Sequence, residues 1–325
     1  MKAVRYEQLG RAADVLTVVD IESPRPGPGE VRVRLAFSGV NPTDWKRRMF
    51  GPAVPAYPGQ IPHQDGSGEI DEVGAGVPGE RMGERVWVFH AAWNRGGGTA
   101  AHYVTVPSDQ AIPLPANTSL EMGASLGIPY ITAHRALTAD GPLKGSTVLV
   151  TAGAGAVGHA AVQLGTFLEA RVISSVSTLE KAEIALNAGA VAALDYRSGS
   201  YVDCLNVHAP QGFDRIIEVA LGANLPTSLQ VLAPGGVIVS YASEQEDPQI
   251  PVRALMTLNA RIRFLLVYNV TSEQIRSATD DITIALESDR FEALPTTVLP
   301  LSDVVRAHEL VEAGTLGRVL LDVRE

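Results

Sequence analysis

The stretch that decides the fold is "TVLVTAGAGAVGHAAVQLG", Thr147–Gly165. It opens with a short apolar run typical of a buried strand, passes through Gly153, Gly155 and Gly158, and ends in a helix-like run. The first glycine permits a tight turn, the second lets backbone approach a pyrophosphate, and the third allows close helix packing, while N–H groups at the helix start hold the anion. The order of strand, loop and helix predicts a dinucleotide-binding loop, and the alternative is a loop that serves packing alone.

On the C-terminal side of this loop, strand-like and helix-like runs alternate. "RVISSV" (171–176) precedes "LEKAEIALNAG" (179–189), and the alternation continues to "VIVSYA" (237–242). This pattern predicts βαβ units and a parallel, doubly wound α/β sheet. Before residue 120 the chain consists instead of short strands broken by Gly and Pro, such as "VRVRLAF" (31–37), which predicts an antiparallel, barrel-like β domain. The tail ends in a strand-like "RVLLDV" (318–323) and is expected to fold back onto one of the two domains.

Length and composition limit the possible functions. At 325 residues the chain is long for one hydrophobic core, so we expect two domains with an active site between them. A formal net charge of -10 disfavours nucleic acid and anionic membranes as partners. The single cysteine, Cys204, forms no intramolecular disulfide, and we find neither a signal-like N-terminus nor a long apolar window. A cytoplasmic protein that acts on small molecules is the expectation.

The end of the second predicted strand, "ISSVSTLEK" (173–181), bears on the choice of cofactor. NAD-binding sites usually place an acid about 20 residues beyond the loop, to hold the ribose hydroxyl. Here the tip carries Ser175, Ser177 and Lys181, and Glu180 is expected to form a helix capping box with Ser177. Hydroxyl donors and a lysine suit a 2′-phosphate, which favours NADPH over NADH. The alternative is that Lys181 is an ordinary solvated lysine.

Several longer stretches carry a family resemblance that spans nearly the whole chain. They are "SGVNPTDWK" (38–46), "PGQIPHQDGSGEIDEVGAGV" (58–77), "GERVW" (83–87), "PYITAHRAL" (129–137), "TAGAGAVGHAAVQLG" (151–165), "EKAEIALNAGA" (180–190), "LAPGGVIV" (232–239) and "GRVLLDV" (317–323). In these stretches the chain resembles the zinc-independent medium-chain dehydrogenases/reductases of the quinone oxidoreductase branch, which includes zeta-crystallin. The resemblance implies a GroES-like, β-barrel-type catalytic domain made of residues 1–122 and 268–325, with a Rossmann NADPH-binding domain at 123–267.

The resemblance also implies which residues contact the cofactor. The pyrophosphate is expected at Ala156, Val157 and Gly158, and the adenosine phosphate near Ser177, Lys181 and Tyr196. The nicotinamide end is expected near Asn41 and Thr132. The rest of the groove is assigned to Ala220, Ser240, Tyr241, Phe264 to Leu266, and Arg318. Relatives pair the edge strands of their Rossmann sheets, so a homodimer through "ARIRFLLVYN" (260–269) is expected.

The same comparison predicts a site without a metal. Zinc-dependent members of the superfamily use a Cys, a His and a Glu, and this chain has Asn41 at the Cys position and Gln64 and Asp65 at the His–Glu positions. Neutral amide oxygens are poor zinc ligands. His63 is offset by one residue, which turns it to the opposite face of an extended segment, so we interpret it as a hydrogen-bonded loop histidine rather than a ligand.

Without a metal, the substrate itself must delocalise the charge that hydride transfer creates, as quinones and α,β-unsaturated carbonyls do. The hypothesis is hydride transfer from NADPH to a quinone, with Asn41 and Lys46 as hydrogen-bond donors and Trp45 as a stacking surface. Bacterial quinone reductases usually carry a tyrosine where this chain has Lys46, so the chain departs from them at the substrate side of the site. Two alternatives stay open: a reductase of enones, enals or enoyl thioesters, and a non-catalytic NADPH-binding protein.

Overall fold

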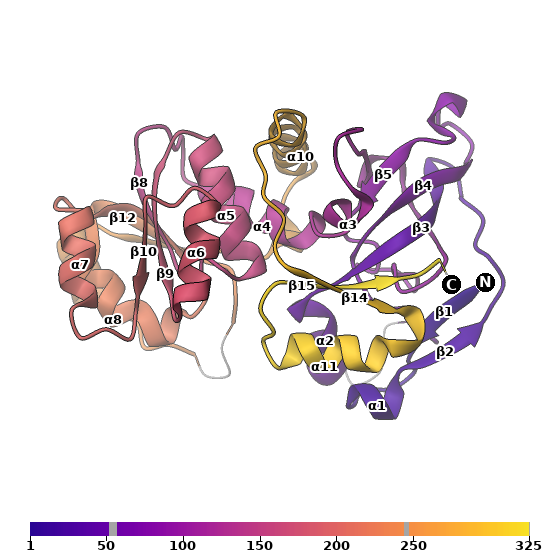
Figure 1. Ribbon diagram of the computed structural model, residues 1–325, viewed down its shortest axis with the longest axis horizontal. Helices are drawn as coiled ribbons and strands as arrows, with labels where there is room; N and C mark the ends of the chain where they lie inside the picture. The colour runs from indigo at the N-terminus through magenta and orange to yellow at the C-terminus, as the bar shows by residue number, and fades with distance from the viewer. Residues whose placement is uncertain (52–56, 244–246, 325) are drawn as a thin grey trace. The chain divides into compact units, whose positions relative to one another are not determined.

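The computed structural model describes residues 1–51, 57–243 and 247–324, and the chain divides into two compact units (Figure 1). The first unit combines residues 1–128 and 295–325, and the second comprises residues 129–294. The expected bounds of this unit were 123–267; it begins later, at residue 129, and ends later, at residue 294, because helix α10 (Ser272–Glu287) packs within it. Ile282 of α10 is fully buried, and Asp281 Oδ2 lies 2.8 Å from His134 Nε2.

The second unit is built on a six-stranded sheet in which all neighbouring strands are parallel. The strands are β8 (Thr147–Val150), β9 (Arg171–Val176), β10 (Ala192–Asp195), β11 (Phe213–Glu218), β12 (Leu232–Ser240) and β13 (Arg261–Phe264). They lie in the order β10-β9-β8-β11-β12-β13, with parallel pairing throughout. The predicted doubly wound sheet is therefore confirmed. The strand order reverses between β8 and β11, and in such sheets ligands bind at the carboxyl ends of the strands beside this reversal.

Helices of the second unit lie between these strands in the chain, with α4 (Gly127–Thr138) before the first strand and α10 after the last. The others are α5 (Ala156–Phe167), α6 (Leu179–Asn187), α7 (Tyr201–His208), α8 (Leu221–Val231) and α9 (Val252–Leu258). Leu149, Ile173, Ile216 and Ile238, from four adjacent strands, form the centre of one core cluster and are at most 2% exposed. Such continuous burial of β-branched and leucine side chains is typical of a parallel sheet covered on both faces.

The first unit is organised around β3 (Glu30–Val40), an 11-residue strand. Val31, Val33 and Leu35 are buried while Arg32 and Arg34 point away from the core, which is the alternation that the sequence predicts for this segment. The other strands are β1 (Lys2–Arg5), β2 (Thr17–Asp20), β4 (Asp65–Val73), β5 (Arg85–Val88), β6 (Tyr103–Pro107), β7 (Ala111–Pro113), β14 (Thr296–Pro300) and β15 (Arg318–Asp322). The sheet runs β14-β15-β3-β4-β5-β7, and β6 also pairs with β3. The chain's tail thus joins the first unit through antiparallel pairing of β15 with β3.

Short helices complete the first unit: α1 (Ala12–Val15), α2 (Pro42–Phe50), α3 (Leu120–Gly123) and α11 (Val304–Glu312). Helix α2 begins directly after β3, where Asn41 is the N-cap and the Asp44 side chain accepts the Asn41 N–H at 2.8 Å. Helix α11 packs against α2 and β15 (Figure 1). The buried Arg48 of α2 joins these helices through its ion pair with Glu312 of α11. This helix pair positions the segment that carries Asn41.

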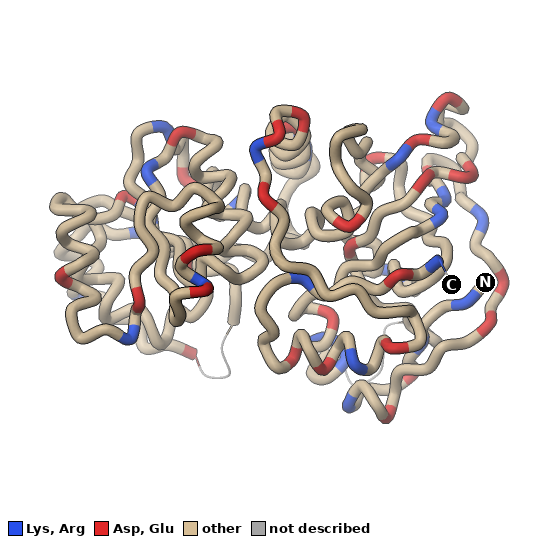
Figure 2. Tube along the Cα trace, in the orientation of Figure 1, with Lys and Arg blue, Asp and Glu red and all other residues tan. Residues whose placement is uncertain are grey.

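Charged residues of both signs are interspersed along the chain (Figure 2). Among the described residues, no helix is both long and apolar enough to cross a lipid bilayer.

Candidate active site

The predicted phosphate loop lies between β8 and α5, at the carboxyl edge of the parallel sheet. Gly155 is the N-cap of α5, so the N–H groups of Ala156, Val157 and Gly158 belong to the first helical turn, where no intrahelical acceptor exists for them. An added Cβ at Gly158 would lie 2.2 Å from the Ala152 carbonyl oxygen, so the helix start packs directly on the loop backbone. The geometry is that of an anion-binding helix terminus.

The predicted adenosine-phosphate residues meet at the ends of β9 and β10. Lys181 Nζ donates to Ser177 Oγ at 3.1 Å, and the Tyr196 N–H donates to the Val176 carbonyl at 3.1 Å. These contacts bring Ser177, Lys181 and the half-exposed Tyr196 together at the end of β9. Strand β9 pairs with β8, the strand that leads into the phosphate loop. Ser175 does not join this surface, since it is 3% exposed and hydrogen-bonded with Tyr201.

One detail of this corner differs from the sequence analysis. The N-cap of α6 is Thr178, whose side chain accepts the Lys181 N–H at 3.2 Å. The capping box expected between Ser177 and Glu180 was therefore wrong by one residue, because two hydroxyl residues stand side by side and the chain uses the second. The shift leaves the Ser177 hydroxyl for Lys181 and leaves Glu180 exposed.

The end of β11 contains a functional candidate that sequence analysis missed, the fully buried Glu218. Its Oε1 accepts hydrogen bonds from the Ala220 N–H at 2.7 Å, from Asn224 Nδ2 at 2.8 Å and from Thr151 Oγ1 at 3.1 Å. Burial raises the pKa of Glu218, while these donors oppose the shift. Glu218 thus ties the segment at Ala220 to Thr151 at the start of the phosphate loop. The available signal was an acid at the end of the apolar run "FDRIIEVA".

Apart from Thr132, the remaining predicted cofactor residues of the second unit follow the same sheet edge. Ser240 ends β12 and is buried, and the Tyr241 N–H donates to the Glu218 carbonyl at 3.3 Å. Phe264 ends β13 and is 69% exposed, and Leu266 follows it at 53% exposed. Thr132, on α4, is buried. Thus the strand ends from β8 to β13 each contribute at least one of the predicted residues.

In the first unit, Asn41, Asp65 and Arg318 form a buried hydrogen-bonded chain. Arg318 Nη1 donates to Asn41 Oδ1 at 3.0 Å, and Asn41 Nδ2 donates to Asp65 Oδ2 at 2.7 Å. The Ile128 N–H completes the chain by donating to both Asp65 oxygens at 2.9 Å. The donor on one side and the acceptor on the other fix the orientation of the Asn41 amide. None of the three side chains is more than 5% exposed.

Burial and the hydrogen bonds around Asp65 together determine the charge of its carboxyl group. Burial raises the pKa of the Asp65 carboxyl to about 6, against the opposing effects of Arg318 and of the Ile128 and Asn41 donors. Burial also raises the pKa of Asp44 well above its usual range, although the Asn41 N–H lowers it. Asp65 must be ionised to accept from both sides, so the arrangement described above requires a pH above about 6.

We expect kcat/KM to fall about tenfold per pH unit below pH 6, because protonation of Asp65 removes the acceptor that orients Asn41. The Asp65→Asn variant should show low activity without this acid limb, since an amide at position 65 has one acceptor oxygen and sets its NH2 donor against either Asn41 Nδ2 or the Ile128 N–H. A pH–rate profile measures both effects. Asp71 lies on β4, as Asp65 does, and forms an ion pair with Arg32 of β3. The Asp71→Asn variant is therefore the control and should keep the acid limb of the profile. A wild-type profile flat down to pH 5 would contradict the assignment.

Trp45 and Lys46, the other predicted substrate residues, follow Asn41 on α2. Lys46 Nζ lies 5.9 Å from the centre of the Trp45 ring, and the Trp45 ring meets the Phe50 ring edge-on at 6.1 Å. Both side chains are partly exposed. The structure therefore brings Lys46 and Trp45 together within one helical segment adjoining the Asn41 chain.

The residues at the zinc-ligand positions of the superfamily do not fit a zinc ion. Asn41 and Asp65 bond to each other, and Gln64 Oε1 accepts the Ala92 N–H at 3.2 Å. Within residues 1–51, 57–243 and 247–324 we find no group of three or more His, Cys, Asp or Glu side chains that could hold a metal ion. The neutral amides of Asn41 and Gln64 lack the charge and softness that zinc selects, and the Asp65 oxygens already accept from Asn41 and Ile128.

His63 is a hydrogen-bonded loop histidine, as predicted. Its Nδ1 lies 2.8 Å from Ser38 Oγ and its Nε2 lies 3.0 Å from His308 Nε2. The Thr99 hydroxyl donates to the Asp65 carbonyl, so Ser38 donates to Thr99 and His63 donates from Nδ1 to Ser38. Burial lowers the pKa of His63 to about 3, which keeps the ring neutral.

Two family models match the chain. The alcohol dehydrogenase GroES-like domain matches residues 27–116, and the zinc-binding dehydrogenase domain matches residues 156–283. Among curated proteins, the chain is 28% identical to the quinone oxidoreductase of Sus scrofa, covering 99% of this chain and 97% of the porcine protein. The human quinone oxidoreductase gives the same identity and coverage.

Solved structures show the same architecture. The quinone oxidoreductase of Escherichia coli, solved in complex with NADPH, is 25% identical with a TM-score of 0.85, covering 99% of this chain and all of that one. An NAD-dependent alcohol dehydrogenase superposes with a TM-score of 0.89 at 25% identity, covering 99% of this chain and all of that one.

Proposed function

Because the chain belongs to the medium-chain dehydrogenases/reductases, in the quinone oxidoreductase branch, we propose that it is an NADPH-dependent reductase that transfers hydride to a quinone. The observation that carries the proposal is that one protein has two features together. The first is a formed phosphate loop with Lys181 beside Ser177. The second is the hydrogen-bonded set of Asn41, Asp65 and Arg318, which is unsuited to zinc. Similarity to the E. coli enzyme that was solved with NADPH supports the cofactor.

The phosphate loop and its neighbours fit the phosphates of this cofactor. The first-turn N–H groups of Ala156, Val157 and Gly158 hold the pyrophosphate, and Ser177, Lys181 and Tyr196 hold the 2′-phosphate. Glu218 keeps the Ala220 segment in place through its hydrogen bonds. When bound, the reduced nicotinamide supplies the hydride.

The residues of the first unit act on the substrate oxygen. Asn41 Nδ2 donates one of its two hydrogens to Asp65. The other hydrogen is the donor for a substrate oxygen that becomes negative during reduction. Lys46 is the second donor, and Trp45 offers a flat apolar surface to a ring. Neutral amide donors stabilise a developing charge less than a metal ion does, so the site suits an acceptor that spreads the charge itself.

Turnover with a panel of acceptors tests the proposal. The purified protein should oxidise NADPH in the presence of simple benzoquinones or naphthoquinones, faster than NADH at equal concentration. A second candidate, reduction of an enone or enal, is favoured by the same metal-free donor set and is recognised by a product that gains two hydrogens at the carbon–carbon double bond. Absence of turnover with every acceptor, in protein that binds NADPH, would show that the chain is a binding protein instead.

Cofactor preference depends on Lys181. Lys181→Glu should raise the KM for NADPH about 10- to 100-fold and leave that for NADH nearly unchanged, because a charge-assisted hydrogen bond is worth about 1.5–3 kcal/mol. Lys144→Glu is the matched control. It makes the same change of charge in the same unit as Lys181, at a surface ion pair with Glu169. Equal effects of Lys181→Glu on the two cofactors would exclude a 2′-phosphate contact.

We also propose a homodimer through β13. This strand lies at the edge of the parallel sheet and pairs with β12 on one side, and Met256, Phe264 and Leu266 nearby are each more than half exposed. An exposed strand edge beside apolar side chains favours pairing with a second copy. Sedimentation velocity should give twice the mass of one chain at micromolar concentration. A species with the mass of a single chain would contradict the dimer.

A further inference from the structure

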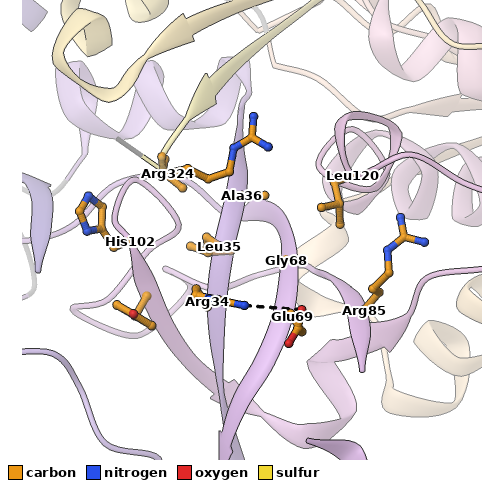
Figure 3. A pocket seen from close by; sticks show the side chains of 11 residues that line it. Arg34, Leu35, Ala36, Gly68, Glu69, Arg85, His102, Leu120 and Arg324 are labelled. Carbon is orange, nitrogen blue, oxygen red and sulfur yellow. Dashed lines mark ion pairs between the residues drawn. The ribbon is translucent and has the colours of Figure 1, made fainter. Parts of the chain in front are cut away.

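The first unit carries a hollow of about 510 Å³ that includes none of the residues assigned to the active site (Figure 3). Its volume lies within the range of about 300–1,000 Å³ typical of small-molecule pockets. The hollow lies over β3, β4 and β5, and the chain's last described residues, through Arg324, form one wall.

A row of charged side chains crosses the strands at this hollow. Arg34 of β3 is the cross-strand partner of Glu69 of β4, and Glu69 is the partner of Arg85 of β5. Directly paired residues point to the same face, and neighbouring strands lie about 4.8 Å apart, so Arg34 and Arg85 flank Glu69 at roughly 10 Å from each other along the row. Arg324 stands at the other side of the hollow (Figure 3).

The charges of this row do not cancel. Three arginines and one glutamate line the hollow, and Asp322 pairs with Arg324, so one positive charge is left over, in a chain whose formal net charge is -10. Arg34 Nη2 lies 3.6 Å from Glu69 Oε2, which is an ion-pair distance too long for a hydrogen bond. Arg324 pairs with Asp322, two residues earlier in the chain, and Arg85 donates to the Thr118 carbonyl at 2.7 Å. The Arg34 guanidinium has five N–H donors, more than its ion pair with Glu69 engages, so Arg34 can donate to a ligand.

The floor of the hollow is apolar and open because its residues are small. Ala36 and Gly68 lie in its middle, between the arginines (Figure 3). A Cβ at Gly68 would lie 2.0 Å from the Arg34 carbonyl oxygen, so the close approach of β4 to β3 requires glycine there. Leu120 and Val323 add apolar surface at the sides.

We propose that this hollow is a second ligand site, for a small anion that carries an apolar body, such as a medium-chain or aryl carboxylate. The carboxylate pairs with the arginines and the apolar body covers Ala36 and Gly68. A planar guanidinium binds a carboxylate through two parallel hydrogen bonds, which is the reason for choosing this anion class. The site shares no lining residue with the proposed NADPH site or with the Asn41–Asp65–Arg318 chain.

Calorimetric titration of the full-length protein with decanoate, at saturating NADPH, tests the site. One decanoate should bind per chain, with an affinity that falls as NaCl is raised. The Arg34→Gln/Arg324→Gln double variant should weaken binding at least tenfold, since each lost charge-assisted hydrogen bond costs about tenfold or more. Arg253→Gln, an exposed arginine of the second unit, is the control and should bind as the wild type does.

Three results would overturn the proposal. One is unchanged decanoate binding in the double variant, and another is equal binding of decan-1-ol, which has the apolar body without the charge. The third is displacement of decanoate by NADPH, which would place it in the cofactor site. Thermal midpoints of both variants, measured beside the wild type, establish that any lost binding belongs to a folded protein. Because the titration requires no turnover, its result is independent of whether quinones are the substrates.

Discussion

A Gly158→Ala variant is expected to bind NADPH at least 100-fold more weakly than the wild type. The new Cβ would lie 2.2 Å from the Ala152 carbonyl oxygen and 3.0 Å from the Gly153 Cα, both of which are backbone atoms. Backbone cannot yield as a flexible side chain does, so the loop must move away from the start of α5. The N–H groups of the first helical turn then lose their common direction toward the pyrophosphate. Fluorescence titration with NADPH measures the loss.

Two other glycines make the result specific. Gly199 has no atom within 4 Å of a built Cβ, so Gly199→Ala controls for the substitution itself and should bind normally. Gly155→Ala brings its Cβ only to 3.3 Å from the Ala152 carbonyl oxygen and should keep the thermal midpoint while weakening NADPH binding by tenfold or less. Circular dichroism reports whether Gly158→Ala remains folded. A folded Gly158→Ala variant with normal NADPH affinity would show that the loop does not hold the cofactor.

The sequence predicted the parts of the molecule that local patterns encode. Glycine spacing after an apolar run located the phosphate loop, because tight turns and close packing leave few residue types possible. The alternation of "VRVRLAF" located β3, and the alternation after Thr147 located the parallel sheet. Lys181 and Tyr196 were predicted as a pair, and the structure brings both to the end of β9.

Other features depend on contacts between distant residues, and the sequence does not reveal them. Nothing in the sequence distinguishes Glu218 from the other acidic residues. Its role follows only from its burial beside Thr151 and Ala220. The raised pKa of Asp65 follows from burial and from Arg318, which is 253 residues away in the chain. The cap at Thr178 shows a different limit, since adjacent hydroxyl residues offer equivalent caps and packing selects between them.

Replacing Arg318 with methionine should lower kcat/KM about 100-fold and move the acid limb of the pH profile to higher pH. Arg318 Nη1 holds Asn41 Oδ1 at 3.0 Å, and its charge lowers the pKa of Asp65. Without the guanidinium, the Asn41 amide is oriented from one side only and the pKa of Asp65 rises above about 6. At neutral pH a larger fraction of Asp65 is then protonated, so the effects on Asn41 reinforce each other. Profiles of kcat/KM from pH 5 to pH 9 measure the magnitude and the shift.

The Arg318→Lys variant separates charge from geometry. Lysine keeps the positive charge but not the fixed planar donors, so it should leave the acid limb near its original pH while recovering only part of kcat/KM. Loss of a direct contact with NADPH would instead appear as a raised KM for the cofactor, with the limb unmoved in both variants. A methionine variant whose profile keeps its limb near pH 6 would therefore show that Arg318 does not control Asp65. The hydrogen-bonded residues Asn41, Asp65 and Arg318 would then serve packing alone. Other donors would have to stabilise the hydride acceptor.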